Sequence, residues 1–143
     1  RSNGSRLLAT NVPKESVKYI KALEASGLNI VGTTTVPEFA SGLESELYGQ
    51  TRNPWNLEYS CIASSSGAGA AVAAGFVPLA PGTAGGGSNR LPSHACGTFG
   101  FKPSRYRMLS GEAGGGHDMF KTNNAISRTV RDSAALFNGF LRG

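Results

Sequence analysis

The chain has 143 residues, of which 39% are hydrophobic and 16% charged, and 20 are glycines. This length suits one domain with a real core, and the composition argues against an intrinsically disordered chain. The formal net charge is +5, but the 14 lysines and arginines are scattered, so we expect no nucleic acid partner. No apolar run has the length of a membrane span, so we expect no membrane partner.

Two cysteines, Cys61 and Cys96, lie far apart in the sequence. Their spacing is not that of a metal-binding pair, and two cysteines are too few for a secreted disulfide scaffold. We therefore expect two reduced thiols in a cytoplasmic protein. The sequence shows no cofactor motif and no metal-ligand cluster, so we expect neither a cofactor nor a metal.

The first part of the chain predicts a helix followed by a short strand. Apolar residues recur at helical spacing after Pro13, and Gly27 follows as a stop signal. Residues 28–35 are rich in β-branched side chains and predict a strand. Residues 41–63 contain turn signals without a sustained period, which predicts a long excursion over the surface. A helix followed by a strand favours an α/β fold.

The middle of the chain predicts elements built from small residues. Residues 67–74 are almost entirely Gly, Ala and Val, so we expect a buried helix that lies close to another backbone. Residues 76–80 are an apolar strand candidate that leads into a glycine run. Residues 97–104 predict a strand and a turn.

The last part of the chain predicts one more helix. Residues 105–124 contain a second glycine cluster, Gly114–Gly116, and show no period. No internal repeat is visible, which agrees with a single domain. A terminal amphipathic helix is predicted by apolar residues at helical spacing, namely Val130, Ala134, Phe137 and Leu141.

The serine cluster Ser64–Ser66 and the single serine Ser88 are the candidates for chemistry. Taken alone, the cluster is also explained as a helix cap, and the glycine run before Ser88 as a flexible turn. A phosphate-binding loop is disfavoured because no lysine precedes Ser88, and a dinucleotide-binding fingerprint is disfavoured because its third glycine is misplaced. Neither His94 nor His117 has the context of a general base, which disfavours a Ser-His-Asp triad.

Residues 63–104 read ASSSGAGAAVAAGFVPLAPGTAGGGSNRLPSHACGTFGFKPS. This stretch resembles the hallmark of the amidase signature hydrolases: a GGSSGG-type loop, a Gly/Ala-rich helix, a VPLALGTD strand, a GGSIR segment and a GLKPT segment. The segments TTTVPEF, GQTRNPWN and ISRTVRDSAALF extend the resemblance over nearly the whole chain. It implies an α/β fold with a mixed twisted sheet flanked by helices. We expect residues 1–143 to be the central part of one such domain, truncated at both ends.

The resemblance also implies a set of site residues. Ser88 corresponds to the nucleophile, and Ser64 to the bridging serine, which the family holds on a cis peptide bond. The oxyanion hole would be formed by the main-chain N–H groups of Gly85, Gly86 and Gly87, together with that of Ser88. The expected substrate-binding residues are Phe39, Ala40, Gly42 and Ser65. This set would cleave the C–N bond of a small carboxamide by acyl transfer.

The family's catalytic lysine has no counterpart in this sequence. By the usual layout of the family it falls before Arg1, and Lys102 belongs to a different family segment. We therefore expect residues 1–143 alone to hydrolyse amides slowly or not at all. Besides the amide substrate, the expected partners are the remaining segments of the same protein or further copies in a homo-oligomer. The alternative is a non-catalytic amidase-like binding module or a degenerate homologue.

Other residues also depart from the family pattern. Ile62, Ala63 and Ser66 replace glycines around the bridging serine. Ala84 stands where the family usually carries Asp, and Asn89 replaces an aliphatic residue beside the nucleophile. We expect the first group of changes to crowd the turn before the predicted buried helix.

Overall fold

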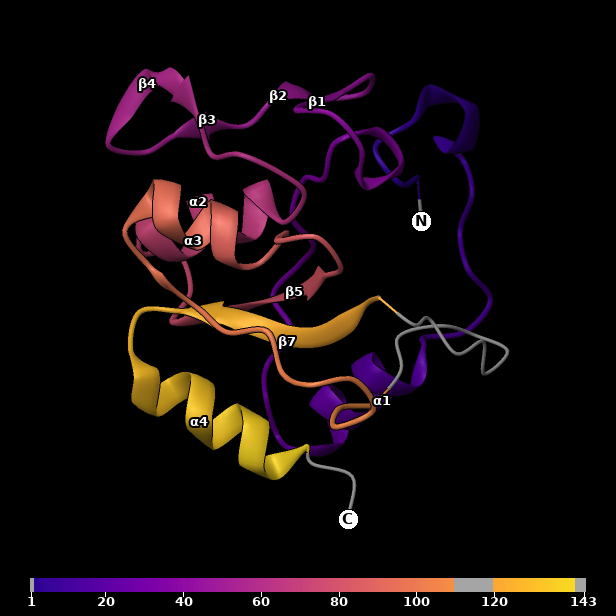
Figure 1. Ribbon diagram of the computed structural model, residues 1–143. Coiled ribbons are helices and arrows are strands. Elements are labelled where there is room, and N and C mark those ends of the chain that lie inside the picture. The colour runs from indigo at the N-terminus through magenta and orange to yellow at the C-terminus, as the bar shows by residue number, and fades with distance from the viewer. Residues whose placement is uncertain (1, 110–119, 141–143) are drawn as a thin grey trace.

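The computed structural model of the protein describes residues 2–109 and 120–140. A three-stranded sheet lies between two layers of helices (Figure 1). Helices α2 and α3 lie on one side of the sheet, and α1 and α4 on the other. These elements are α1 Lys18–Ala25, α2 Ser66–Ala73, β5 Leu79–Ala84, α3 Arg90–Cys96, β6 Phe99–Gly100, β7 Thr122–Ser127 and α4 Val130–Gly139. The predicted α/β fold class is confirmed.

Strand β7 is the middle strand and joins the two layers. It pairs antiparallel with β5 along its full length and with β6 near its end. Ala125 packs with Tyr19 and Leu23 of α1, whereas Ile126 packs with Val72 of α2. Successive side chains of a strand point to opposite faces of its sheet. This one strand therefore contributes to both hydrophobic cores.

Helix α2 lies very close to two other segments because it is built from small residues. A Cβ atom on Gly67 would lie 2.6 Å from the carbonyl oxygen of Thr35, and one on Gly69 would lie 3.1 Å from the Cβ atom of Pro92. Both distances are shorter than the optimal separation of non-bonded atoms. The N–H group of Gly67 instead donates to the Thr35 carbonyl at 3.1 Å. The predicted close approach of this helix to another backbone is confirmed.

Two small hairpins lie above α2 and α3 in Figure 1. The second hairpin is tied to the end of α3, because Asn53 Nδ2 donates to the Ala95 carbonyl at 2.7 Å and Trp55 Nε1 donates to the Cys96 carbonyl at 2.8 Å. Carbonyl groups in the last turn of a helix have no intrahelical donor, so these side chains satisfy them. The hairpin strands are β1 Glu44–Ser45 with β2 Gly49–Gln50, and β3 Arg52–Asn53 with β4 Asn56–Ser60.

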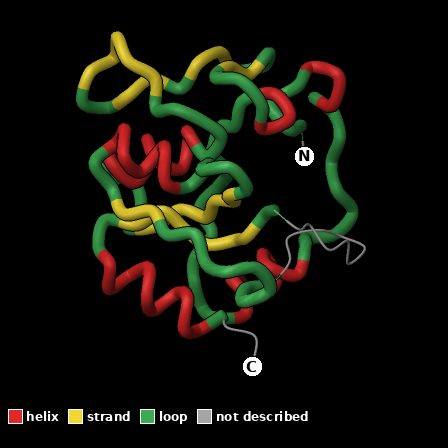
Figure 2. Tube along the Cα trace, viewed as in Figure 1, coloured by secondary structure: helices red, strands yellow, loops and turns green. Residues whose placement is uncertain are grey.

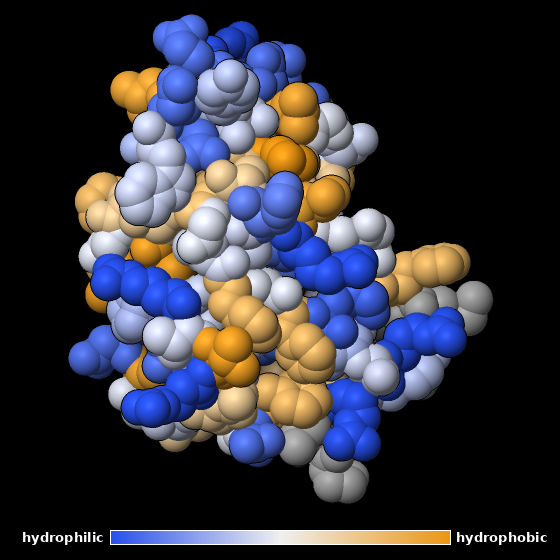
Figure 3. Space-filling view, turned by 60° about the vertical axis from the view of Figure 1, so that its left-hand side comes forward, coloured by the Kyte–Doolittle hydropathy of each residue, from blue (hydrophilic) through white to orange (hydrophobic). Residues whose placement is uncertain are grey.

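Long loops connect the elements, especially in the first part of the chain (Figure 2). Two 3₁₀ turns, Arg6–Leu8 and Glu38–Ala40, interrupt them. Apolar and hydrophilic side chains lie next to one another on the face that Figure 3 shows. Within the two described ranges, no helix combines the length and the apolar character that crossing a membrane requires.

Most predicted elements are present, with shifted bounds. Helix α1 ends before Gly27 as predicted, but it begins at Lys18 rather than after Pro13. The strand predicted at residues 76–80 begins at Leu79 and continues into the glycine-rich segment, because pairing with β7 fixes its extent. Helices α2 and α4 and strand β6 occupy predicted segments.

The strand predicted at residues 28–35 is not formed. These residues belong to no strand, because none of the described strands pairs with them. The described strand pairs are all antiparallel, so parallel pairs of the expected mixed sheet are not found in this part of the chain.

The face that the terminal helix turns to the core matches the prediction only in part: Phe137 packs against the core, half-buried. Val130 is 62% exposed, and the buried residues are Ser133, Leu136 and Phe140. The apolar pattern was misleading because a serine occupies one of the buried positions. Leu141 and the Gly114–Gly116 cluster lie outside the described residues.

We expect Gly67→Ala to destabilise the full-length gene product by about 1–3 kcal/mol, because the added methyl group would overlap the main chain of Thr35. Gly139→Ala in α4 is the matched control. A Cβ atom there meets no atom within 4 Å, and alanine is favoured over glycine in a helix by up to about 1 kcal/mol. Thermal unfolding measures both variants. A Gly67→Ala protein as stable as the wild type would contradict the close packing of α2.

Candidate active site

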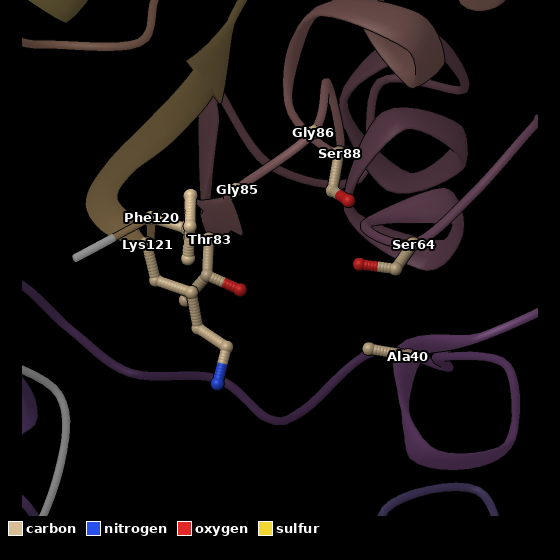
Figure 4. A pocket seen from close by; sticks show the side chains of 8 residues that line it. All are labelled: Ala40, Ser64, Thr83, Gly85, Gly86, Ser88, Phe120 and Lys121. Carbon is tan, nitrogen blue, oxygen red and sulfur yellow. The ribbon is translucent and has the colours of Figure 1, made fainter. Parts of the chain in front are cut away.

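A cavity of about 380 Å³ opens where the end of β5 and the start of β7 face the loops that precede α2 and α3 (Figure 4). Its volume is that of a small-molecule site. The lining comes from four separate parts of the chain, so only folding brings these residues together. The described lining residues are Ala40, Ser64, Thr83, Gly85, Gly86, Ser88, Phe120 and Lys121.

Ser64 contributes the first hydroxyl group of the cavity. It lies between β4 and α2, and the peptide bond between Ala63 and Ser64 is cis, as the family resemblance implies. Ile62, which replaces a family glycine, has a φ of 56°. This left-handed conformation favours glycine. The turn therefore keeps the backbone conformation of a glycine although the residue has changed.

Ser88 contributes the second hydroxyl group, from the loop between β5 and α3. In Figure 4 the side chains of Ser64 and Ser88 point into the cavity from the side of α2 and α3. Ser64 is 5% exposed, and Ser88 is partly exposed. Within the described structure no hydrogen bond joins the two hydroxyl groups. The fold thus brings both predicted serines to one cavity without placing them in direct contact.

Hydrogen bonds of the next residues hold the two serine loops together. The N–H group of Ser65 donates to the carbonyl of Ser88 at 3.2 Å, and Ser65 Oγ donates to Asn89 Oδ1, also at 3.2 Å. Asn89 is fully buried, and its Nδ2 donates to the carbonyl of Gly82 at 3.5 Å. A Cβ atom on Gly82 would lie 2.8 Å from Ser65 Oγ, so glycine makes room for this network.

Ser65 has a different environment from the one expected of a substrate-binding residue. It is buried, its hydroxyl group is hydrogen-bonded to Asn89, and it is not among the described residues that line the cavity.

Of the other expected substrate-binding positions, Ala40 lines the cavity, whereas Phe39 and Gly42 are neighbours of Ala40 outside the described lining. Phe39, Ala40 and Gly42 all have left-handed φ angles, between 50° and 70°, so this segment turns sharply at the cavity.

The three glycines before Ser88 differ in how strictly they are needed. Gly87 has a φ of 142°, and a Cβ atom there would lie 3.0 Å from Leu91 Cδ1. A Cβ atom on Gly85 would meet nothing closer than 3.8 Å, and one on Gly86 nothing within 4 Å. Of these three positions, the backbone therefore requires glycine only at Gly87.

Main-chain N–H groups of this loop are available at the cavity. Among the described residues, those of Gly85, Gly86, Gly87 and Ser88 donate to no protein acceptor. Gly85, Gly86 and Ser88 line the cavity, and Gly87 is buried. Unpaired N–H groups beside a hydroxyl group can bind an oxygen that carries negative charge.

Sequence reasoning did not find three of the lining residues. Thr83 lies inside the strand motif, but nothing in the sequence shows which of its residues face a cavity. Phe120 and Lys121 lie in a stretch without periodicity, so they gave no signal. Lys121 is the one charged side chain among the described lining residues.

The cysteines and histidines of the described chain lie away from the cavity lining. Cys61 and Cys96 are both free thiols, as predicted, and both are buried. The hydrogen bond shared with Cys96, together with burial, raises the pKa of Cys61 well above its usual range, so Cys61 is a neutral thiol at pH 7.

His94 is exposed on α3, and His117 lies outside the described residues. No group of three metal-ligating side chains occurs in the part of the chain that the structure describes.

Comparison with known proteins finds relatives of this chain. The chain is 38% identical to a putative amidase of Synechocystis sp. over 99% of its own length, and 42% identical to a lipoamidase of Enterococcus faecalis over 98%. A structure of 6-aminohexanoate cyclic dimer hydrolase complexed with substrate superposes with a TM-score of 0.82, at 35% identity over 89% of this chain.

The chain spans only part of these proteins: 29% of the Synechocystis protein, 19% of the lipoamidase and 27% of the hydrolase structure. The family model described as Amidase matches residues 1–142. The match covers nearly the whole chain and includes every described residue that lines the cavity. The chain belongs to the amidase family.

Proposed function

We propose that the full-length protein is an amidase in which Ser88 is the nucleophile. Ser88 Oγ attacks the amide carbonyl carbon, forms a C–O bond and leaves an acyl-enzyme when the C–N bond breaks. Ser64 passes the proton of Ser88 toward a base and returns a proton to the leaving nitrogen, which departs as ammonia or an amine. Water then cleaves the acyl-enzyme by the same route and releases the carboxylic acid.

One observation carries this proposal: two serine hydroxyl groups and unpaired main-chain N–H groups meet at a single cavity. The N–H groups of Gly85, Gly86, Gly87 and Ser88 are suited to stabilise the negative oxygen of the tetrahedral intermediate. Such preorganised donors usually provide the largest single contribution to acyl-transfer catalysis. Membership of the amidase family supports a carboxamide as the substrate.

The base is the part of the mechanism that these residues do not supply. Serine is a weak nucleophile at its own pKa and needs a base within reach. The family resemblance assigns that role to a lysine that precedes Arg1 in the usual layout. We therefore make the proposal for the full-length protein, and we expect residues 1–143 by themselves to be slow or inactive.

We expect a fluorophosphonate probe to label Ser88 in the full-length protein, and Ser88→Ala to abolish both labelling and amide hydrolysis. Loss of a serine nucleophile lowers kcat by more than about 1,000-fold, and Ser64→Ala should lower it by about 100-fold or more, because proton transfer is impaired. Peptide mapping identifies the labelled residue, and release of ammonia or amine measures turnover.

Ser93→Ala is the matched control for these two variants. Ser93 is a buried serine of α3 whose hydroxyl group has no hydrogen-bond partner in the described structure, so kcat should not change. Labelling of a residue other than Ser88, or full activity of Ser88→Ala, would exclude Ser88 as the nucleophile. A folded protein with no labelling would instead favour the non-catalytic amidase-like module.

Gly87→Ala tests the proposed oxyanion hole. Alanine rarely adopts a φ of 142°, so the loop must change and misalign its N–H groups. We expect kcat to fall by about 100-fold with little change in KM. Gly27→Ala is the matched control. Gly27, at the end of α1, also has a left-handed φ, and a Cβ atom there would meet no atom within 4 Å. This substitution should reduce stability but leave kcat unchanged. Equal kcat values for the Gly87→Ala and wild-type proteins would refute the role of this loop.

A further inference from the structure

The wall of the cavity opposite the two serines carries a positive charge. Figure 4 shows the side chain of Lys121 entering the cavity from the β7 side, whereas Ser64 and Ser88 enter from the side of α2 and α3. The other described lining residues are uncharged. A substrate that reaches both walls would therefore place its amide at the serines and another group beside the ammonium of Lys121.

The start of β7 holds Lys121 in this place. The next residue, Thr122, is buried and pairs with Ala84 at the end of β5. The Lys121 side chain is itself exposed and keeps the hydration that a charged ammonium requires. A lysine ammonium has three N–H donors, so it can bind a ligand while it keeps a contact with the protein.

The neighbours of Lys121 indicate which ligand would fit. Thr83 lines the same wall and offers a hydroxyl group. Phe120 also lines the cavity, on the same side as Lys121 in Figure 4, and 71% of its surface is exposed, so it offers an apolar surface next to the ammonium. A carboxylate on a short apolar spacer fits these groups, because the ammonium and the hydroxyl group can donate to its oxygens.

We propose that Lys121 binds a carboxylate of the substrate, so that the protein acts on carboxamides that carry an anionic group several bonds from the scissile C–N bond. This inference rests on the proposed function, because it takes the serine side of the cavity as the site of cleavage. It adds a specificity-determining residue and a substrate class to that function.

The test uses two fluorophosphonate probes of equal tail length on the full-length gene product, one with a methyl end and one with a carboxylate end. The wild-type protein should react faster with the carboxylate probe. Lys121→Met should reduce the ratio of the two labelling rates about fivefold, the size expected for an exposed ion pair. Lys121→Arg should restore most of the preference, and added salt should weaken it.

Lys102→Met is the matched control. It removes the same net charge, but Lys102 lies outside the described lining and its Nζ donates to the Pro103 carbonyl. Its labelling ratio should equal that of the wild type. Hydrolysis of hexanamide and of adipic acid monoamide, which differ only in a terminal carboxylate, gives a second measurement of the same ratio through kcat/KM.

The outcomes separate this inference from the proposed function. If Ser88 is labelled by both probes and Lys121→Met leaves the ratio unchanged, the inference is wrong and the proposed function stands. If Lys102→Met reduces the ratio of the two labelling rates as much as Lys121→Met does, the inference is also wrong, because the effect would then come from net charge alone. If neither probe labels Ser88 in the folded wild-type protein, the proposed function fails and the inference fails with it.

Discussion

The main-chain hydrogen bond between Ser65 and Ser88 is the contact on which the site depends. It joins the residue after Ser64 to Ser88 itself, so the distance between the two hydroxyl groups is set by the backbone rather than by flexible side chains. The bond from Ser65 Oγ to the buried side chain of Asn89 reinforces it. Buried polar groups are costly unless they are paired, which favours this one arrangement of the two loops.

Close packing of main chains makes that contact possible. Gly67 lets the first turn of α2 approach Thr35, and Gly82 leaves the space that Ser65 and Asn89 fill. The substitution of Asn for the family's aliphatic residue at position 89 is thus accommodated by hydrogen bonds to its neighbours. Ile62 has a φ of 56°, in the left-handed region that glycine adopts readily.

The close packing of α2 could be predicted because it has a local cause. Small side chains let two backbones approach whatever the rest of the chain does. The shared cavity of Ser64 and Ser88 has no such local cause, because the two residues lie in separate loops that only the fold brings together. It was expected from the family resemblance alone.

The elements that were missed depend on distant contacts. Strand β7 reads TNNAIS, yet all six residues are buried. The side-chain Nδ2 groups of its two asparagines donate to loops, Asn123 to the Leu109 carbonyl and Asn124 to that of Phe101. Nothing in the local pattern shows those partners. Helix α3 was not predicted, although its only proline among the described residues, Pro92, stands in the first turn, where proline removes no intrahelical hydrogen bond.

Residues 28–35 show the opposite case. Their β-branched side chains favour a strand, yet they form none. A strand also needs a neighbour that accepts and donates its main-chain hydrogen bonds, and none of the described strands provides one. Local propensity therefore could not predict the missing partner.

In the glycine run before Ser88, the backbone conformation requires glycine at one position, whereas only the proposed chemistry explains glycine at another. Folding explains Gly87, because its φ is unfavourable for other residues, but it does not explain Gly86, where a side chain would meet no atom. A side chain at Gly86 would instead occupy the cavity that this residue lines. Glycine there keeps the N–H groups of the loop accessible to a molecule in the cavity. This need agrees with the proposed binding of an oxyanion, and a loop that served only as a flexible turn would have no such requirement.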